Sequence, residues 1–186
     1  MDYRSTGTSF AALLAEGVFL VAALVLSATP SQAEIPDVIA VPGELPATLL
    51  HAEGAQIHQC TAGPHNQRAW QPREPIATLM LDGNTVGRHY GGLHWEQVDA
   101  STPRWEHIDG SSVRAKIVAT AAGVTADDLP WLKLRVVSQN GNGLFYGVSH
   151  VQRINTKGGI AQGSCDKAGG FLSVPYSADY IFWRAN

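Results

Sequence analysis

The side chains with the widest chemical range lie in one short stretch, VGRHYGGLHWEQVDASTPRWEHIDGSSV, which spans residues 86–113. It contains His89, His94 and His107, and neutral imidazole is a common ligand of zinc and copper. If the Gly-Gly pair forms a two-residue hairpin turn, His89 faces His94 across the strands, with Cβ atoms about 4.5–5.5 Å apart. One hypothesis is therefore a zinc or copper site on these histidines, with Glu96 as an alternative third ligand. The other interpretation is a pair of surface imidazoles beside a turn.

Carboxylates in the same stretch suggest general acid–base chemistry as a second possibility, through Glu96, Asp99, Glu106 and Asp109. A pair that cleaves glycosidic bonds needs a defined separation and one carboxyl group with a raised pKa. The sequence fixes neither property. Because Asp109 precedes a glycine, we favour a turn there, in which the carboxylate binds nearby backbone.

Nucleophilic catalysis has little support in this sequence. The chain has no Gly-x-Ser-x-Gly elbow around a serine nucleophile. Ser149 and His150 are adjacent, and neighbouring side chains of a strand point to opposite faces, so we do not expect them to form a dyad. A binding protein is therefore favoured over an enzyme.

The five tryptophans give the main indication of binding. Trp131 and Trp183 are expected in the core. Trp70, Trp95 and Trp105 lie in polar contexts, where exposed rings often stack on sugars or other flat ligands. The residues predicted to contact a ligand are His89, Tyr90, Trp95 and Trp105.

Strands must position these residues, because apolar side chains recur with a period of two along most of the chain. Residues 76–90 predict two strands about a turn at Asp82 and Gly83, and residues 131–154 predict another hairpin. Residues 64–75 are expected to form an irregular loop. The inward faces of two further strands are predicted to carry Val113, Ala115, Ile117, Ala119 and Ala121, and Leu172, Val174, Tyr176, Ala178, Tyr180 and Phe182.

The expected fold is all-β, an antiparallel sandwich or closed barrel of about eight to ten strands, because no long amphipathic helix interrupts these patterns. One short helical turn is predicted in VTADDLPW, where Thr125 can cap the turn and Pro130 ends it.

The chain is expected to comprise a signal peptide, an arm and one domain. Residues 17–28 form an apolar run that would reach only about 18 Å as a helix, short of the ~30 Å hydrocarbon core. Small residues follow it, so residues 1–33 are predicted to be a cleaved signal peptide, with a membrane anchor as the alternative. Residues 34–53, with three prolines, are expected to be an extended N-terminal arm, and residues 54–186 a single β-rich domain.

The chain has only two cysteines, Cys60 and Cys165. After export to an oxidising compartment they most simply form one disulfide, and we expect a secreted or periplasmic location. The formal net charge of −3 gives no electrostatic reason to expect nucleic acid or an anionic membrane as partner.

Four motifs resemble the secreted domain-of-unknown-function 3455 family of bacteria and fungi: VGRHYGG, PRWEHIDGSSVRAKIV, LPWLKLRVVS and VQRINTKGGIAQGSC. The resemblance runs from about Gly54 to Trp183. It implies a secreted, β-rich domain without an established activity. Residues 93–102, LHWEQVDAST, look like an insertion relative to that pattern, so chemistry carried by His94 or Trp95 would belong to this protein and its near relatives.

Taken together, the sequence predicts a secreted module that binds a small molecule, a glycan or another extracellular component. A metal-dependent activity on the histidines and a structural or stress role in the cell envelope are the two alternatives. No membrane span is expected after cleavage of the signal peptide.

Overall fold

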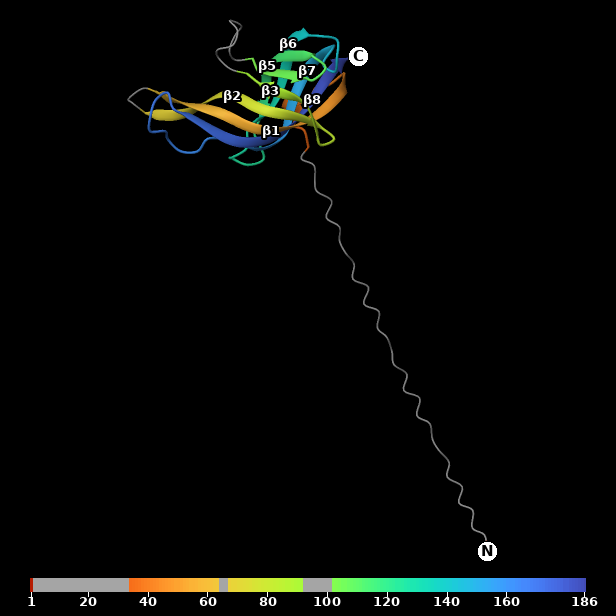
Figure 1. Cartoon of the computed structure of the whole chain (residues 1–186), viewed down its shortest axis with the longest axis horizontal. Coiled ribbons are helices and arrows are strands. Elements are labelled where there is room, and N and C mark those ends of the chain that lie inside the picture. Colours follow the sequence, from red (N-terminus) through yellow and green to blue (C-terminus); the bar gives the residue numbers. More distant parts are fainter. Residues whose placement is uncertain (2–33, 64–66, 92–101) are drawn as a thin grey trace. The chain divides into compact units, whose positions relative to one another are not determined.

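The computed structural model describes Met1 and residues 34–63, 67–91 and 102–186. Eight antiparallel strands make up the fold of these residues (Figure 1). The strands are β1 Glu44–Ala62, β2 Arg68–Leu81, β3 Asn84–Tyr90, β4 Arg104–His107, β5 Ser112–Ala121, β6 Trp131–Asn140, β7 Val148–Gly158 and β8 Phe171–Ala185. Each strand pairs with the next, and β8 pairs with β1, so the sheet closes into a barrel. The all-β antiparallel prediction is confirmed, and of the two architectures that it allowed the structure has the barrel.

Inward-facing side chains fill much of the barrel, because eight strands leave an interior only slightly wider than the side chains that enter it. Aromatic rings from three segments meet there. Trp105 lies edge-on to Phe182 with ring centroids 6.2 Å apart, and Phe182 lies 4.4 Å from Phe145 of the β6–β7 connection. The predicted inward face of the last strand is confirmed for the buried residues Tyr176, Ala178, Tyr180 and Phe182.

The inward face predicted for β5 is right only in its first half. Val113 and Ala115 belong to the interior core, but Ala119 and Ala121 pack against a second cluster outside it. The register of β5 against β6 shifts between Ile117 and Ala119. Such a bulge adds a residue to one strand and exchanges its inner and outer faces, which a strict period of two does not foresee.

The second cluster forms where the segment before β1 packs against the barrel. Ile39 is fully buried, and it packs with Trp131, Ile154 and Ile181. The Gln152 side chain donates a hydrogen bond to the Ile39 carbonyl at 2.9 Å. The arm predicted over residues 34–53 therefore ends earlier than expected, because β1 begins at Glu44.

The segment predicted as a helical turn near Thr125 is a hydrogen-bonded turn but not a helix: the Asp128 N–H donates to the Thr125 carbonyl, and the Thr125 hydroxyl accepts the Asp127 N–H as predicted for a cap. The 3-10 helix Asp37–Ile39 is the one helix of the described residues, and residues 124–128 form a turn. One oxygen of the Asp128 carboxylate accepts hydrogen bonds from the N–H and the hydroxyl of Thr125, and the other accepts the Gly158 N–H. These bonds hold the turn against the end of β7 and compete with helix formation. Across the described residues, no helix has the length and apolarity needed to cross a membrane.

Part of the segment predicted as an irregular loop is the first half of β2. Residues 68–75 pair with β1, whereas the pairing of β2 with β3 begins only at Ile76. Pro72 and Pro75 therefore lie where the described strands leave one side of β2 unpaired. Proline lacks an N–H donor and is tolerated at such an edge.

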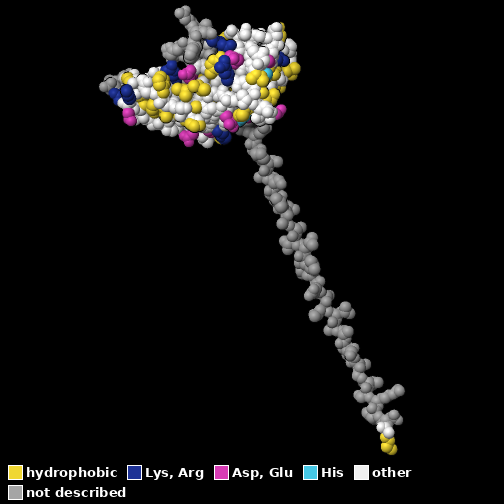
Figure 2. Space-filling model, in the orientation of Figure 1, with side chains coloured by type: hydrophobic (Ala, Val, Ile, Leu, Met, Phe, Trp, Pro, Cys, Tyr) yellow, Lys and Arg dark blue, Asp and Glu magenta, His cyan; other side chains and the backbone are white. Residues whose placement is uncertain are grey.

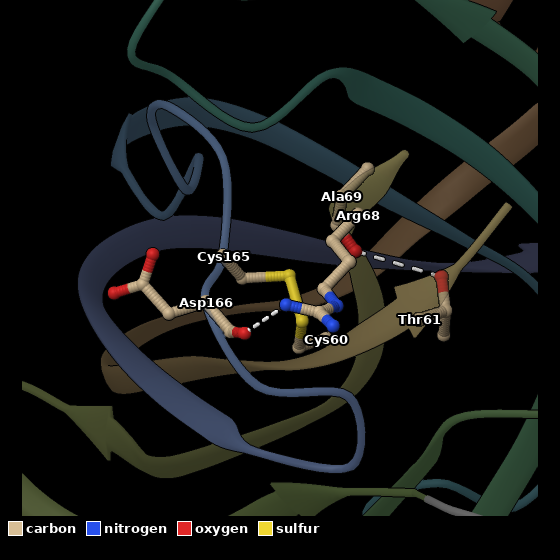
Figure 3. The surroundings of a disulfide bond; sticks show 6 residues. All are labelled: Cys60, Thr61, Arg68, Ala69, Cys165 and Asp166. Atoms are coloured by element: carbon tan, nitrogen blue, oxygen red, sulfur yellow. Dashed lines mark hydrogen bonds between the residues drawn. A yellow bond between two sulfur atoms is a disulfide. The ribbon is translucent and has the colours of Figure 1, made fainter. Parts of the chain in front are cut away.

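The predicted disulfide is confirmed. Cys60 and Cys165 are bonded, with Cα atoms 5.8 Å apart and a sequence separation of 105 residues (Figure 3). The Cys60 N–H donates to the Gly170 carbonyl, and the Gly169 N–H donates to the Cys60 carbonyl. Beside the bond, the Arg68 guanidinium donates to the Asp166 carbonyl. The disulfide thus links the end of β1 to the loop that precedes β8.

Replacing both cysteines, Cys60→Ala with Cys165→Ala, is expected to lower the free energy of unfolding by roughly 3–5 kcal/mol, because the bond closes a long loop in the unfolded chain. Urea denaturation followed by tryptophan fluorescence measures the loss. Reduced wild-type protein is the matched control and should lose a similar amount. Equal urea midpoints for oxidised wild type and the double variant would contradict this expectation.

Candidate ligand-binding cavity

The barrel contains a cavity of about 470 Å³ that is partly open to solvent. All eight strands contribute to its wall, and only the interior of a closed barrel is shared by every strand. One lining residue from each strand, in chain order, is Gln56, Arg73, His89, Trp105, Ile117, Leu134, Arg153 and Tyr180. The volume lies within the range of about 300–1,000 Å³ that is usual for small-molecule sites.

His89 of β3 forms part of the aromatic wall of this cavity. Its ring stacks on Trp105 of β4, its partner in the sheet, with centroids 4.3 Å apart and an angle of 12° between the planes. Tyr180 of β8 completes the group at 4.9 Å from the His89 ring. Three rings from three strands thus form one packed aromatic group in the cavity wall.

Burial keeps His89 uncharged. Loss of hydration lowers the pKa of His89 from 6.5 to about 3, and the nearby positive charge of Arg153 lowers it further. His89 Nδ1 lies 2.9 Å from the Arg104 carbonyl oxygen, which can only accept, so Nδ1 carries the proton. Nε2 is therefore a hydrogen-bond acceptor in the neutral ring.

Arg153 of β7 brings a positive charge to the same cavity. The residue is only 8% exposed. Its Nε and Nη2 donate to the Pro130 carbonyl at 3.1 and 2.9 Å. Among the described residues, no aspartate or glutamate lies within 4.0 Å of its guanidinium as an ion-pair partner. Buried charges in proteins are usually paired with an opposite charge or a metal, so this guanidinium is unusual.

The residues predicted to contact a ligand lie on two faces of the barrel. His89 and Trp105 line the cavity, but Tyr90 lies on the opposite face of β3, where its hydroxyl donates to Glu106 at 2.8 Å. Trp105 is 1% exposed, so the expectation of a solvent-exposed ring is wrong for this residue. Trp95 lies outside the described residues. Of the four residues predicted to contact a ligand, His89 and Trp105 therefore line the cavity.

The two-residue hairpin assumed for the histidine pair is wrong. His89 faces Trp105 in the β3–β4 ladder, and the chain between Gly91 and Thr102 is too long for a two-residue turn. His107 Nδ1 lies 2.9 Å from an Asp109 carboxylate oxygen. Within the described residues, no three His, Cys, Asp or Glu side chains are arranged to hold a metal ion. His94 lies outside those residues, so the zinc or copper site stays a prediction.

The candidate catalytic carboxylates have lowered pKa values. Burial raises the pKa of Glu106, but hydrogen bonds from Tyr90 and Arg88 outweigh that effect and leave it below the usual value. Burial likewise opposes the net shift of Asp109, whose carboxylate accepts the N–H groups of Ser111 and Leu144 and has a pKa well below the usual value. Glu96 and Asp99 lie outside the described residues. A general acid needs the opposite shift.

Ser149 and His150 share one partner, contrary to the prediction that they point apart. A bulge between Val148 and His150 breaks the alternation of β7. The Ser149 hydroxyl and His150 Nδ1 both contact the Glu44 carboxylate. In a serine triad the hydroxyl and the carboxylate contact different ring nitrogens. The Ser149 hydroxyl lies 3.3 Å from the same Nδ1 that faces Glu44, so this cluster lacks the triad geometry.

An outer hollow of about 530 Å³ beside β5 and β6 is lined by several cationic residues. Arg104 donates to the Ser112 hydroxyl and lies 3.5 Å from a Glu106 oxygen. Arg114 and Lys116 also have partners. Three of the cationic residues of this hollow thus have partners already, which makes the cavity inside the barrel the stronger candidate site.

Arg153 and Gln56 are the buried polar residues of the cavity that sequence reasoning missed. Arg153 lies two residues after Val151, whose side chain belongs to the interior core, so both residues face inward. A charged residue at an inward position of a strand could have indicated the site.

The fold and the cavity define a class: a closed antiparallel barrel with one disulfide and an interior site of small-molecule size. The chain belongs to the family of proteins of unknown function DUF3455, whose model matches residues 80–184. The match includes β3 to β8, and therefore His89, Trp105, Arg153 and Tyr180. No curated protein and no solved structure matches the chain.

The buried state of His89 predicts a specific pH dependence of stability. In the unfolded chain His89 takes up a proton near pH 6.5, but in the folded protein only near pH 3. The unfolded state therefore binds more protons between these values, so this histidine lowers stability as the pH falls from about 6.5 towards 3.

His89→Gln is expected to reduce this loss. The measurement is the free energy of unfolding in urea at intervals from pH 7 to pH 5, above the range in which most carboxylates titrate. Circular dichroism at pH 7 verifies that the variant is folded. The same decline in wild type and variant over this interval would contradict a neutral, buried His89.

Proposed function

We propose that this protein binds a small molecule inside its barrel. The observation that carries the proposal is the cavity itself, whose wall is built by all eight strands. Small eight-stranded barrels can hold one small ligand in this way. The wall combines apolar side chains, such as Leu132 and Leu134, with a few buried polar groups, which is the usual composition of a ligand site.

The pKa values of the candidate acids and bases favour binding over catalysis. With a pKa of about 3, His89 is too weak a base to take a proton efficiently near neutral pH. Glu106 and Asp109 have lowered pKa values, so neither suits the role of a general acid. The cavity therefore offers surfaces and hydrogen-bonding groups to a ligand more readily than acid–base chemistry.

The proposed site of action is outside the cytoplasm. Disulfides persist mainly in secreted and periplasmic proteins, and the Cys60–Cys165 bond is typical of such a compartment. The proposal includes removal of residues 1–33 as a signal peptide, since the apolar run ends before the first described strand. The ligand would then be a molecule of the periplasm or the surroundings of the cell.

Filling the cavity should abolish binding. Leu134 is 1% exposed and lines the cavity, so Leu134→Trp is expected to weaken binding of the neutral fluorescent probe N-phenyl-1-naphthylamine by more than tenfold. The matched control is Val118→Trp, which adds the same ring at an exposed position of β5 and should leave binding unchanged.

Probe fluorescence titration measures both variants, and Leu132→Phe provides a smaller change if Leu134→Trp does not fold. Overpacking a core commonly costs about 1–3 kcal/mol of stability, so thermal unfolding is recorded alongside. A wild-type protein that does not bind the probe, or a folded cavity-filling variant that binds it as tightly, counts against the interior site.

Metal binding is the second candidate function, favoured by the neutral state of His89. Its Nε2 retains the lone pair that a zinc or copper ion requires. If His89, His94 and His107 hold a metal, wild type dialysed against zinc or copper retains it, and His94→Ala loses it. His150→Ala, at the Glu44 cluster, is the control that keeps it. Elemental analysis measures the zinc or copper that each dialysed protein retains. Wild type that holds no metal after dialysis would rule out metal binding at these histidines.

A further inference from the structure

We infer that the ligand of the interior cavity is a carboxylate on a flat, largely apolar body, and that Arg153 binds its charged group. This inference rests on the proposed function, since it names the class of molecule that the same cavity would take. It follows from the charge of the cavity wall, the burial of Arg153 and the aromatic surface beside it.

The wall of the cavity carries positive charge and no negative charge among its described residues. Arg73 and Arg153 line it, and no described lining residue is an aspartate or a glutamate. The outer surface is different, because Figure 2 shows acidic and basic side chains beside hydrophobic ones on the visible face. The interior therefore suits a ligand with a negative charge.

The two arginines differ in their partners. Arg73 Nε lies 3.3 Å from a Glu74 oxygen, and its guanidinium lies over the Phe171 ring at 4.8 Å. Its charge is thus balanced by a neighbouring carboxylate. Arg153 is bonded to the Pro130 carbonyl, a neutral dipole that satisfies N–H groups without neutralising the cation.

A guanidinium at 8% exposure, with no carboxylate partner among the described residues, is costly, because burial removes most of the water that would stabilise the charge. A guanidinium has more N–H donors than the two that Pro130 occupies. A carboxylate supplies one negative charge and can accept two parallel hydrogen bonds from such a group. One arginine without an ion-pair partner in the described part of the chain matches one charge, which favours a carboxylate over a phosphate dianion.

The aromatic and aliphatic residues of the wall indicate the shape and polarity of the uncharged part of the ligand. Trp105, His89 and Tyr180 line the cavity with ring centroids within 5.4 Å of one another, and Leu132 and Leu134 also line it. A flat aromatic body packs favourably against a wall of this composition. His89 Nε2 can accept one hydrogen bond from a hydroxyl or N–H of the ligand, because Nδ1 is already bonded to the Arg104 carbonyl.

The test compares two molecules of nearly the same shape, 1-naphthylacetic acid and 1-naphthylacetamide. Each displaces N-phenyl-1-naphthylamine from the wild-type protein at pH 7, where the acid is ionised. The acid is expected to bind at least tenfold more tightly than the amide, which corresponds to one charge-assisted hydrogen-bonded pair.

Arg153→Met is expected to bring the acid and the amide to within about threefold of each other, since the charge-assisted pair is gone. Arg153→Lys retains the charge without the planar fork and should keep a smaller preference for the acid. The matched control is Arg135→Met, at an exposed position of β6 away from this cavity, which should retain the full preference.

The outcomes separate the two proposals. If wild type binds the neutral probe but prefers the amide or shows no preference, the carboxylate inference is overturned and the proposed function stands. If Arg153→Met keeps the preference for the acid, the assignment to Arg153 is overturned. If the probe, the acid and the amide all fail to bind wild type, the interior site itself is rejected. The wild-type comparison decides the ligand charge even if Arg153→Met does not fold.

Discussion

The pairing of β8 with β1 is the constraint on which the other features depend. These strands are far apart in the sequence, yet they pair from Glu44 with Ala185 to Gln59 with Phe171. The pairing closes the sheet, creates a single interior and gives every strand an inner and an outer face. On its other side β1 pairs with β2, and Gly54 allows a close approach there, because a Cβ atom would lie 2.1 Å from the Ile76 carbonyl oxygen of β2.

Closure also explains why the interior can hold both a packed core and a cavity. Phe145 and Phe182 fill one part with ring contacts, while His89, Trp105, Arg153 and Tyr180 line the open part. Burial in this interior also changes the properties of His89 and Arg153. It lowers the pKa of His89, and it leaves the charge of Arg153 without the hydration that an exposed side chain would have.

Several features could be predicted from the sequence because they depend on local chemistry or on elimination. Alternation of apolar residues predicted strands, Asp82 and Gly83 predicted a turn, and both residues have the positive φ of a hairpin turn. Cys60 and Cys165 had only each other as partners. The candidate site was predicted in part, since His89 and Trp105 were named, but as members of a surface.

Only the tertiary structure decided which face of each strand became interior. Bulges in β5 and β7 shift the alternation, so Ala119 moves outside and Ser149 and His150 reach the same carboxylate. The partner of His89 is Trp105 because β4 follows a long connection, and sequence spacing alone cannot fix that register. The strands, a turn and the disulfide could be predicted from the residues alone, because each requires few residues. The cavity and the burial of Arg153 in its wall required closure of the barrel, because that step brings together side chains from every strand.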